Sequence, residues 1–560
     1  MSSAPLNGTR YKKTLFRRRS IAVPEEMRKV VLAMKKHYFK QIVCLFAAVL
    51  LLVPGALIAL AAGEDVSGSR VVVYDAPEGF DVRDDYVVEV SAGGEWLSVP
   101  VYSALVTRSR KTCTETFFAS VDLEGTMQVR VTPKQSFADA QIRPFSDGIN
   151  GTVENGTLCF EVDHPCQLSV ELDGDVMHNL QLFVNGILTD APDPADPDVL
   201  WFGPGVHTAE NDSRISVENG VPILYVHSGQ TVWLADGAVL KSRIKPDRGS
   251  HDVTVGGRGI VDLYDWNTWE ATDASITEAF GIRISGVEAI DVTGLTVSGV
   301  VFRNATAYTV CGQNLKDAKF ENVKLFSCSD FADGIDLMSA DNVEIRDSYL
   351  RSNDDSIVAS GTCWFAVGGC RNWLVENCVF LTDCGHAIYI GGIGKDDELC
   401  DMTFRDLDIL DDYEDSSYYW GAVGVNSCDG NFVHDLTFED IRIERVTKGE
   451  PIRLTVRDNY EKKNTPGKGI SDVTFRNITV LSAGEKCTVN GLKDAKIRNV
   501  SFENMMYKGK HIGPLNYRTA FHMMKNSENV RFDAAYDGPL GRVLNFFALL
   551  WNRLLDLLRI

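Results

Sequence analysis

Three clusters of reactive side chains lie close together in the middle of the chain. They have the sequences DGID at 333–336, NDD at 353–355 and CGHA at 384–387, and each borders a short apolar run that is typical of a β-strand. The groups suited to chemistry are Asp333, Asp336, Asp354, Asp355 and His386. Glycoside hydrolysis requires one protonated and one ionised carboxyl group beside the bond that breaks.

The spacing of these residues predicts that they meet on one face of the protein. Asp333 and Asp354 are 21 residues apart, Asp355 and His386 are 31 apart, and Arg453 follows 67 residues after His386. These separations correspond to one, one and two coils of a fold made of stacked repeats. Because equivalent residues of stacked strands lie about 5 Å apart, we expect one patch that spans these coils.

Crowded carboxylates suit this chemistry, because each negative charge raises the pKa of its neighbour and keeps one acid protonated. Two other interpretations stay open. Four carboxylates can bind Ca²⁺, as in a polysaccharide lyase, and a β-helix can bind glycans without cleaving them. The pair Gly385-His386 has no role in a lyase, so we predict an enzyme that uses no metal and no cofactor.

Internal repeats indicate the architecture that positions the clusters. The segments 291–297, 401–407, 435–441 and 472–478 each begin with Asp, an apolar residue and Thr, and related runs recur about every 22 to 37 residues. The intervening sequence has no helical periodicity. We therefore predict an all-β fold with a right-handed parallel β-helix over 195–515, with stacked apolar residues inside and Asn or Asp at its turns.

The flanking segments differ in composition. Residues 1–40 form a basic leader, and residues 41–62 are almost wholly apolar, which predicts a signal anchor or a signal peptide. Residues 68–190 contain short β-rich runs, which predict a sandwich-like accessory domain. Residues 539–560 have the pattern of an amphipathic helix that caps the β-helix or lies on a membrane. We expect a monomer outside the cell, anchored through its N-terminal segment or secreted.

Composition and cysteine content set further limits. The net charge of −21 over 560 residues excludes nucleic acid as the expected partner, because no basic surface is available for phosphates. The 13 cysteines lack metal-binding spacing. In an exported chain we expect disulfides for some of them and a buried core position for Cys378.

The three clusters resemble, in order and spacing, the signatures of glycoside hydrolase family 28, the polygalacturonases and their relatives. The similar stretches are 333–336, 353–357 and 385–391, and the resemblance extends over about 195–515. It implies a right-handed β-helix and inverting hydrolysis of a polysaccharide or oligosaccharide by single displacement. An accessory β-domain before the β-helix is also similar to the dextranases of family 49, which is the alternative enzyme class.

The resemblance also implies a role for each matching residue. Asp354 corresponds to the general acid, Asp333 and Asp355 to the pair that activates water, and His386 to the residue that supports the acid and contacts the sugar. The residues expected to bind substrate are Asp336, Tyr389, Arg453 and Arg457.

The chain departs from the family pattern at three places. Phe331-Ala332 replaces Asn-Thr before the first cluster, and Ala387 replaces the second Gly of Gly-His-Gly. Thr455 stands where the family's Arg-x-Lys motif has its Lys, although Arg457 is on the same strand face as Arg453. A pectic polysaccharide remains the expected substrate, but these departures favour rhamnogalacturonan, a substituted pectin or a neutral glycan over plain polygalacturonate.

Overall fold

The computed structural model describes residues 68–108, 113–263, 285–329, 331–459 and 465–533. Within these residues the only helices are two 3-10 turns, η1 Phe145–Asp147 and η4 Tyr517–Thr519, so the predicted all-β class is confirmed. No helix in this described part is long and apolar enough to cross a membrane. The predicted leader, apolar segment and C-terminal helix, at 1–40, 41–62 and 539–560, lie outside the described residues.

Residues 70–186 form two facing sheets with one core. One sheet has the strand order β1-β5-β11-β10-β7 with β4 paired to β5, and the other has the order β3-β2-β6-β9-β8. The core contains Val88 and Val129 from one sheet and Phe117 and Leu182 from the other, which makes this part a β-sandwich. Its strands are β1 Arg70–Val72, β2 Tyr86–Ser91, β3 Leu97–Val99, β4 Tyr102–Val106, β5 Thr114–Glu124, β6 Met127–Pro133, β7 Ala140–Arg143, β8 Thr152–Glu154, β9 Thr157–Val162, β10 Cys166–Leu172 and β11 Asp175–Gly186.

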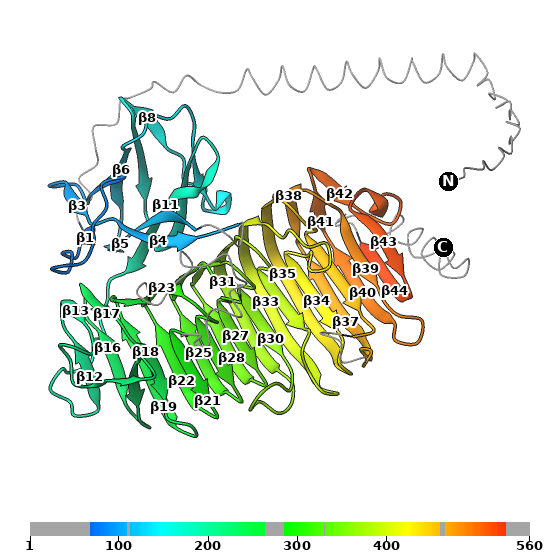
Figure 1. The fold of residues 1–560 in the computed structure, drawn as a ribbon. Coiled ribbons are helices and arrows are strands. Elements are labelled where there is room, and N and C mark those ends of the chain that lie inside the picture. Colours follow the sequence, from blue (N-terminus) through cyan, green and yellow to red (C-terminus); the bar gives the residue numbers. More distant parts are fainter. Residues whose placement is uncertain (1–67, 109–112, 264–284, 330, 460–464, 534–560) are drawn as a thin grey trace, which may run out of the picture. The chain divides into compact units, whose positions relative to one another are not determined.

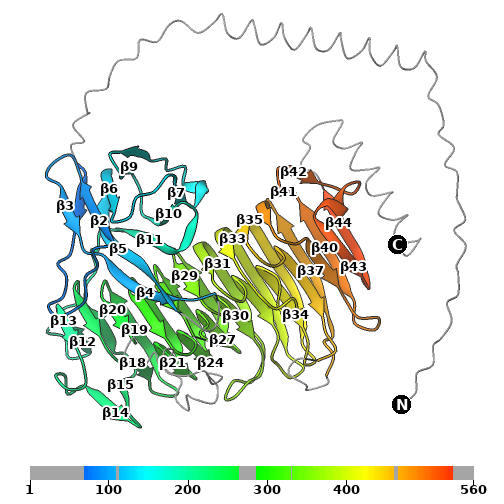
Figure 2. The ribbon, with the colours of Figure 1, turned by 45° about the horizontal axis from the view of Figure 1, so that its top comes forward.

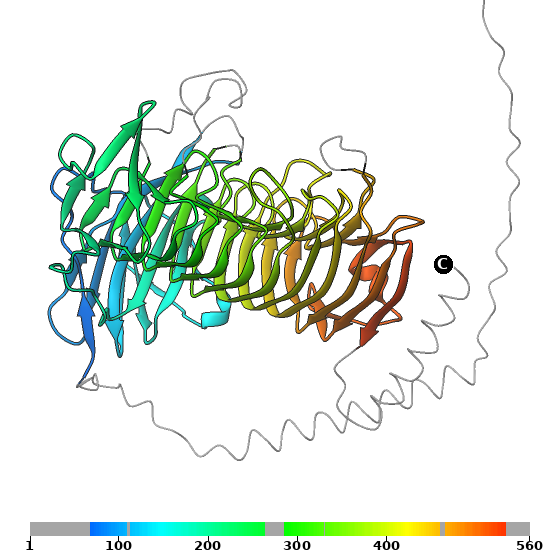
Figure 3. The ribbon, with the colours of Figure 1, turned by 90° about the horizontal axis from the view of Figure 1, so that it is seen from below.

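Residues 199–533 wind into coils whose strands pair in parallel with those of the next coil, apart from the hairpins β14–β15 and β41–β42. Figures 1 and 3 show these strands following one another in chain order along the stack. The predicted parallel β-helix is therefore confirmed.

The β-helix strands that the structure describes belong to two sheets. The larger sheet contains β12 Val199–Phe202, β13 Gly205–His207, β16 Thr231–Leu234, β17 Ala238–Leu240, β19 His251–Gly257, β20 Ile260–Asp262, β22 Thr293–Ser298, β23 Val301–Ala305, β25 Lys316–Glu321, β26 Lys324–Ser327, β28 Asp341–Arg346, β29 Tyr349–Ser352, β31 Arg371–Thr382, β33 Glu398–Asp412, β35 Phe432–Val446, β37 Gly469–Arg476, β38 Thr479–Ala483, β40 Ile497–Glu503, β41 Met505–Tyr507, β42 Lys510–Ile512 and β44 Ser527–Asp533. The smaller sheet contains β14 Ile215–Glu218, β15 Val221–Val226, β18 Arg243–Pro246, β21 Val287–Ile290, β24 Val310–Gln313, β27 Ile335–Met338, β30 Ile357–Ser360, β32 Ile388–Gly391, β34 Val423–Ser427, β36 Ile452–Val456, β39 Cys487–Asn490 and β43 Phe521–Lys525.

Inward side chains recur from coil to coil and stack on one another. Phe404, Phe438, Phe475, Phe502 and Phe532 hold equivalent positions, and the centroids of neighbouring rings are 4.7–5.0 Å apart. Stacked rings and aliphatic side chains form one continuous core along the coils. Because Phe532 extends this ladder, the stack runs to the end of β44, beyond the predicted limit at residue 515.

Asn and Asp occupy the turns, as the repeats predict. Asn322, Asp347, Asn377, Asp440 and Asn477 all have a positive φ, a conformation that these two residue types adopt more readily than most others. The side-chain amide of Asn377 donates to Asp347 Oδ1 at 2.6 Å, and that of Asn477 donates to Asp440 Oδ1 at 2.8 Å. These turns therefore form a hydrogen-bonded ladder that fixes the register of successive coils.

The sandwich packs against the β-helix through an aromatic cluster. Phe118 and Phe183 of the sandwich contact Phe326 of the β-helix, with ring centroids 5.3 Å and 6.0 Å apart, and Phe183 also contacts Tyr349. Strand β4 runs beside the coils (Figure 2), and the amide of Leu105 donates to Asn304 Oδ1 at 2.9 Å. The sandwich and the coils thus share a buried interface.

The sequence predicted disulfides for some cysteines without naming pairs. The structure gives free thiols at Cys159, Cys166, Cys311, Cys370, Cys400 and Cys487. Most of them are buried in the sandwich or the coils, where Cys serves as a small apolar residue. Cys378 is also a buried thiol, which confirms its predicted core position.

Candidate active site

The candidate site lies on the outer face of the smaller β-helix sheet. Strands β27, β30, β32, β34 and β36 are consecutive neighbours in that sheet and are about 4.8 Å apart. Their inward residues in register are Ile335, Ile357, Ile388, Val423 and Ile452. The residues that the motifs predict for the site lie on either side of this row.

The first column of functional residues precedes the strands by two positions. It contains Asp333, Asp355 and His386, from three adjacent coils. The amide of Gly334 donates to the carbonyl of Asp355 at 2.8 Å, and the amide of Ser356 donates to the carbonyl of His386 at 2.7 Å. Backbone pairing therefore continues past the strand ends and brings these side chains to the same edge of the sheet.

The second column follows the register row by one position. Asp336, Tyr389 and Arg453 hold equivalent places in it, with Val358 and Gly424 on the coils between them. Every residue that the motifs predict for the site is thus on β27, β30, β32 or β36 or within three residues of one of these strands.

The carboxyl groups of Asp333, Asp336, Asp354 and Asp355 form a cluster on the two adjacent coils that contain β27 and β30. Asp333 and Asp336 are only 6% and 4% exposed, and a hydrogen bond joins their side chains. Burial raises the pKa of Asp333 well above its usual value, and the charges of Asp354, Asp336 and Asp355 add to this rise. Burial, followed by the charge of Asp355, likewise raises the pKa of Asp336. These two acids therefore hold a proton at a pH where an exposed carboxyl group is ionised.

Asp355 is held by His386 on the next coil. One of its oxygens, Oδ1, accepts from the His386 amide at 2.8 Å and pairs with His386 Nδ1 at 2.6 Å. The Asp355 amide in turn donates to Asp354 Oδ1 at 3.1 Å. The imidazole also lies against Tyr389, with ring centroids 4.5 Å apart. These contacts fix the position of the acids and of His386 relative to one another.

Gly424 leaves the space that the imidazole occupies. A Cβ atom at this position would lie 2.6 Å from Cδ2 and 3.0 Å from Nε2 of His386. No family motif identified this glycine from the sequence. The only available signal was its in-register place one coil after Tyr389.

Arg453 and Arg457 lie two coils beyond His386. Arg453 Nη1 donates to the carbonyl of Ser417 at 2.8 Å, and the Arg457 guanidinium lies 3.9 Å from the ring centroid of Tyr418. Burial lowers the pKa of Arg453, the charge of Glu450 opposes this effect, and the charge of Arg457 adds to it. Arg453 Nε and Arg457 Nη1 are buried and have no hydrogen-bond partner among the described residues. The N–H groups at both atoms can donate hydrogen bonds to an anion.

Thr455 and Glu450 make the neighbourhood of these arginines less cationic. Thr455, where the family pattern has Lys, donates to Asn426 Oδ1 at 3.0 Å, and Asn426 donates to the Tyr389 hydroxyl at 2.9 Å. Burial raises the pKa of Glu450 to about 7, against the opposing effects of Arg453 and of a hydrogen bond from Thr488. The hydrogen-bonded side chains of Thr455, Asn426 and Tyr389 thus place neutral polar groups beside the two arginines.

A partly exposed aromatic pair, Tyr308 and Trp364, lies on the opposite side of the acids. Tyr308 precedes β24 by two positions, which places it one coil before Asp333 in the first column. Its ring stacks on that of Trp364, with centroids 5.9 Å apart and an interplanar angle of 23°. Trp364 is 61% exposed. Exposed rings of this kind can stack on a sugar ring.

The support behind the site comes from the sandwich and was not predicted from the sequence. The side-chain amide of Asn353, next to Asp354, donates to the carbonyl of Thr107 at 2.8 Å. Arg108 donates to Asp383 at 3.3 Å and to Asp411 at 2.9 Å. No local pattern marks these contacts, because their partners are 246 to 303 residues apart in sequence.

Arg351 completes this support from within the coils. It is fully buried and pairs with Asp383 through Nε at 2.8 Å, while its Nη1 donates to Asn179 Oδ1 of the sandwich at 2.8 Å. Glu414 accepts from the amide of Gly385 at 3.0 Å, directly before His386. The turns that carry the site residues are therefore fixed from behind.

Comparisons with known proteins agree with the motifs and the fold. Residues 248–520, a little under half of the chain, match the model of "Glycosyl hydrolases family 28". A curated protein described as "Probable endopolygalacturonase D", from Neosartorya fischeri, is 26% identical over 196 residues, which are 34% of this chain and 38% of that protein. The chain thus spans well under half the length of this relative.

One solved structure shows the same architecture. Dex49A from Penicillium minioluteum aligns over 82% of this chain and 96% of its own, with a TM-score of 0.52 and 12% identity, so the likeness concerns the fold. A family 28 exopolygalacturonase from Yersinia enterocolitica aligns over 74% of this chain and 97% of its own, with a TM-score of 0.43 and 13% identity. The match of residues 248–520 to the family 28 model confirms the resemblance predicted from the motifs.

Proposed function

We propose that this chain is an inverting glycoside hydrolase that cleaves a pectic polysaccharide outside the cell. In this proposal Asp354 protonates the leaving oxygen, and Asp333 with Asp355 activates the attacking water. His386 holds Asp355 and contacts the sugar. The chain acts as a monomer, secreted or anchored through residues 41–62.

The observation that carries the proposal is the cluster of Asp333, Asp336, Asp354 and Asp355 on two adjacent coils. Burial and mutual repulsion raise the pKa values of Asp333 and Asp336, so within the proposed pair Asp355 is the group that accepts the proton from water. Asp355 is instead held as a hydrogen-bond acceptor by the amide and ring of His386. Inverting hydrolysis needs one acid to donate a proton and another to accept one from water.

The two ends of the site suggest how a sugar chain lies across it. The Tyr308–Trp364 pair provides a stacking surface one coil before Asp333, and Arg453 and Arg457 provide positive charge two coils after His386. The unpartnered Nε and Nη1 atoms of the two arginines support binding of a uronate carboxylate there.

A neutral glycan is the second candidate substrate. Thr455 lacks the charge of the family's Lys and is bound to Asn426, and Glu450 lies near Arg453. These features favour a sugar without a carboxylate, as in a dextranase-like α-glucan hydrolase.

Digestion of a substrate panel tests both candidates. The purified chain is incubated with polygalacturonate, methyl-esterified pectin, rhamnogalacturonan and dextran, and NMR spectra recorded at once give the anomer of each new reducing end. We expect cleavage of a pectic substrate with inversion. Cleavage of dextran alone supports the second candidate. Unsaturated products that absorb in the ultraviolet, or retained configuration, would contradict the mechanism.

A further inference from the structure

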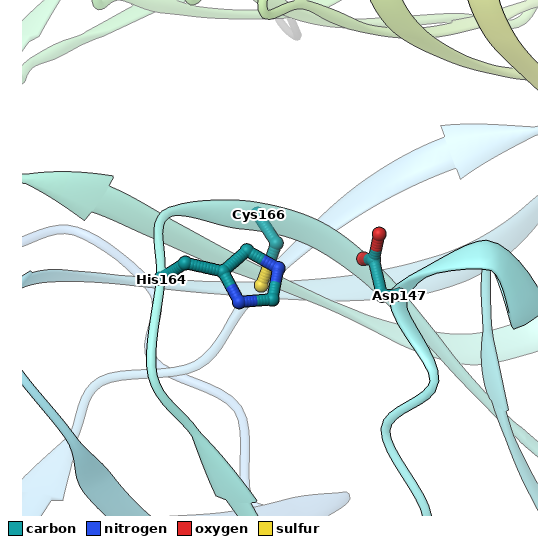
Figure 4. Close-up of side chains that lie close together, drawn as sticks. All are labelled: Asp147, His164 and Cys166. Atoms are coloured by element: carbon teal, nitrogen blue, oxygen red, sulfur yellow. The ribbon is translucent and has the colours of Figure 1, made fainter.

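Three side chains of the sandwich that the site does not use lie close together. Asp147, His164 and Cys166 each bring one potential ligand atom to within 4.8 Å of the others. Figure 4 shows Asp147 facing His164 and Cys166. Carboxylate, imidazole and thiolate are the ligand types that Zn²⁺ binds in proteins.

The local fold explains why these residues meet. Strand β7 pairs antiparallel with β10, with Arg143 opposite Ser169, so the turn after β7 runs back past the start of β10. Asp147 ends the short helix η1 in that turn, and Cys166 is the first residue of β10. His164 lies two residues before Cys166, in the connection from β9.

The ligand set is held in place by neighbouring contacts. Asp163 Oδ1 lies 2.6 Å from His164 Nδ1, which leaves Nε2 for a metal, and a carboxylate beside a ligating histidine commonly orients its ring. The η1 turn is fixed to the coils, because the amide of Phe145 donates to Glu444 at 2.6 Å and the hydroxyl of Ser146 donates to Asp408 at 2.9 Å.

The surroundings of the three residues are acidic and open to solvent. All three line a cavity of about 680 Å³, so solvent can supply a fourth ligand. Asp190, Asp347 and Asp408 line the same cavity.

We propose that Asp147, His164 and Cys166 form a three-ligand Zn²⁺ site that joins the η1 turn to the start of β10. The ligand atoms around one tetrahedral Zn²⁺ lie about 3.4–3.6 Å apart. Side-chain rotations that move the ligand atoms of Asp147, His164 and Cys166 about 1 Å closer together therefore complete the site. Because η1 also contacts Glu444 and Asp408, the bound metal stabilises the sandwich at its interface with the coils. This site is separate from the carboxyl cluster and does not depend on the proposed hydrolase activity.

Titration of the whole chain with Co²⁺ tests the proposal, because Co²⁺ reports thiolate ligation by a charge-transfer band in the near ultraviolet. We expect one equivalent to bind with this band, Zn²⁺ to displace it, and Zn²⁺ to raise the melting temperature. Cys166→Ser should abolish the band, while Cys159→Ser, a control in the same sandwich, should keep it.

His164→Gln provides a second test that does not change the core, since this side chain is 44% exposed. We expect its affinity for Co²⁺ to fall at least tenfold. A wild-type chain without the band, a band that survives Cys166→Ser, or unchanged affinity in His164→Gln would each overturn the proposal.

Discussion

The coils contain two clusters of aspartate side chains, and the pKa shifts in the two clusters have opposite directions. Asp383 and Asp411 lie behind the site and are surrounded by Arg108, Arg351 and Arg445. The second cluster is the site itself and consists of Asp333, Asp336, Asp354 and Asp355. Burial alone would raise the pKa of Asp411, but the charges of Arg108 and Arg445 outweigh it and lower that pKa. At Asp333 and Asp336 burial and repulsion act together and raise the pKa.

The two clusters show that aspartate can serve as a structural ion-pair partner or as a group suited to proton transfer, depending on the charges beside it. Ion pairs behind the site hold the sandwich on the coils. At the site itself, burial and the charges of neighbouring carboxyl groups favour the protonated forms of Asp333 and Asp336. Perturbed pKa values of this kind are concentrated at functional sites.

The largest expected effect is on catalysis. Asp354→Asn removes the proposed proton donor but keeps an oxygen that can accept from the Asp355 amide. Turnover should fall by about 10²–10⁴-fold, the usual contribution of a general acid, with little change in melting temperature. Reducing-end assays on the cleaved substrate measure the loss.

A matched control for this prediction is Asp317→Asn. Asp317 is an exposed turn residue with positive φ, a conformation that Asn also accepts. Its variant should retain wild-type turnover, and equal activity in the Asp317 and Asp354 variants would exclude Asp354 as the acid.

The next largest effect is on stability. Arg351→Met leaves Asp383 buried without its fully buried partner, and breaking a buried ion pair in this way costs about 3–5 kcal/mol of unfolding free energy. Urea denaturation measures the change. Asp333→Asn is the contrasting variant, because it relieves repulsion and should leave stability equal or higher. A comparable loss in both variants would remove the distinction between the two acidic groups.

The pH dependence of stability should have opposite signs for the two groups. Asp336 has a raised pKa in the folded state, so its contribution is present at low pH and is lost as pH rises above about 4. Asp411 has a lowered pKa, so its contribution is lost as pH falls below about 4. Between pH 3 and 8, the unfolding free energy of Asp336→Asn should therefore fall less with rising pH than that of the wild-type chain. The unfolding free energy of Asp411→Asn should fall less than that of the wild-type chain as the pH becomes acidic. Curves of unfolding free energy against pH that run parallel to the wild-type curve in both variants would argue against these assignments.

The smallest expected effect concerns the aromatic end of the site. Trp364→Ala removes one ring of the partly exposed pair, and aromatic contacts of this kind contribute about 0.5–1.5 kcal/mol. KM for a long substrate should rise about 2–10-fold with kcat unchanged. A short oligosaccharide that does not reach this coil is the control. A fall in kcat instead of a rise in KM would show that Trp364 acts on the acids.

The sequence allowed part of this arrangement to be predicted. Within the coils, residues one period apart must become neighbours, so the spacing of Asp333, Asp355 and His386 was sufficient to place them on adjacent strands. The contacts of Thr107 and Arg108 could not be predicted in this way. They arise from the docking of a separate domain, which no periodic pattern encodes.

The sequence could not show which cysteines stay free, for a related reason. A disulfide needs two cysteines whose Cα atoms are about 4.4–6.8 Å apart with suitably directed side chains. Residues such as Cys370 and Cys487 instead take single places in the apolar interior, where neighbouring coils supply Leu, Ile or Phe. An oxidising location allows disulfides but does not require them.

The ladder of Asn and Asp turns makes the length of the substrate-binding surface adjustable in fixed steps. Because each rung bonds to the rung before it, a whole coil can be added or deleted without disturbing the remaining register. Loss of the β34 coil between His386 and Arg453 would move the arginines about 4.8 Å towards the acids. Insertion or deletion of one coil would thus change the distance between the arginines and the acids without replacing any of these residues.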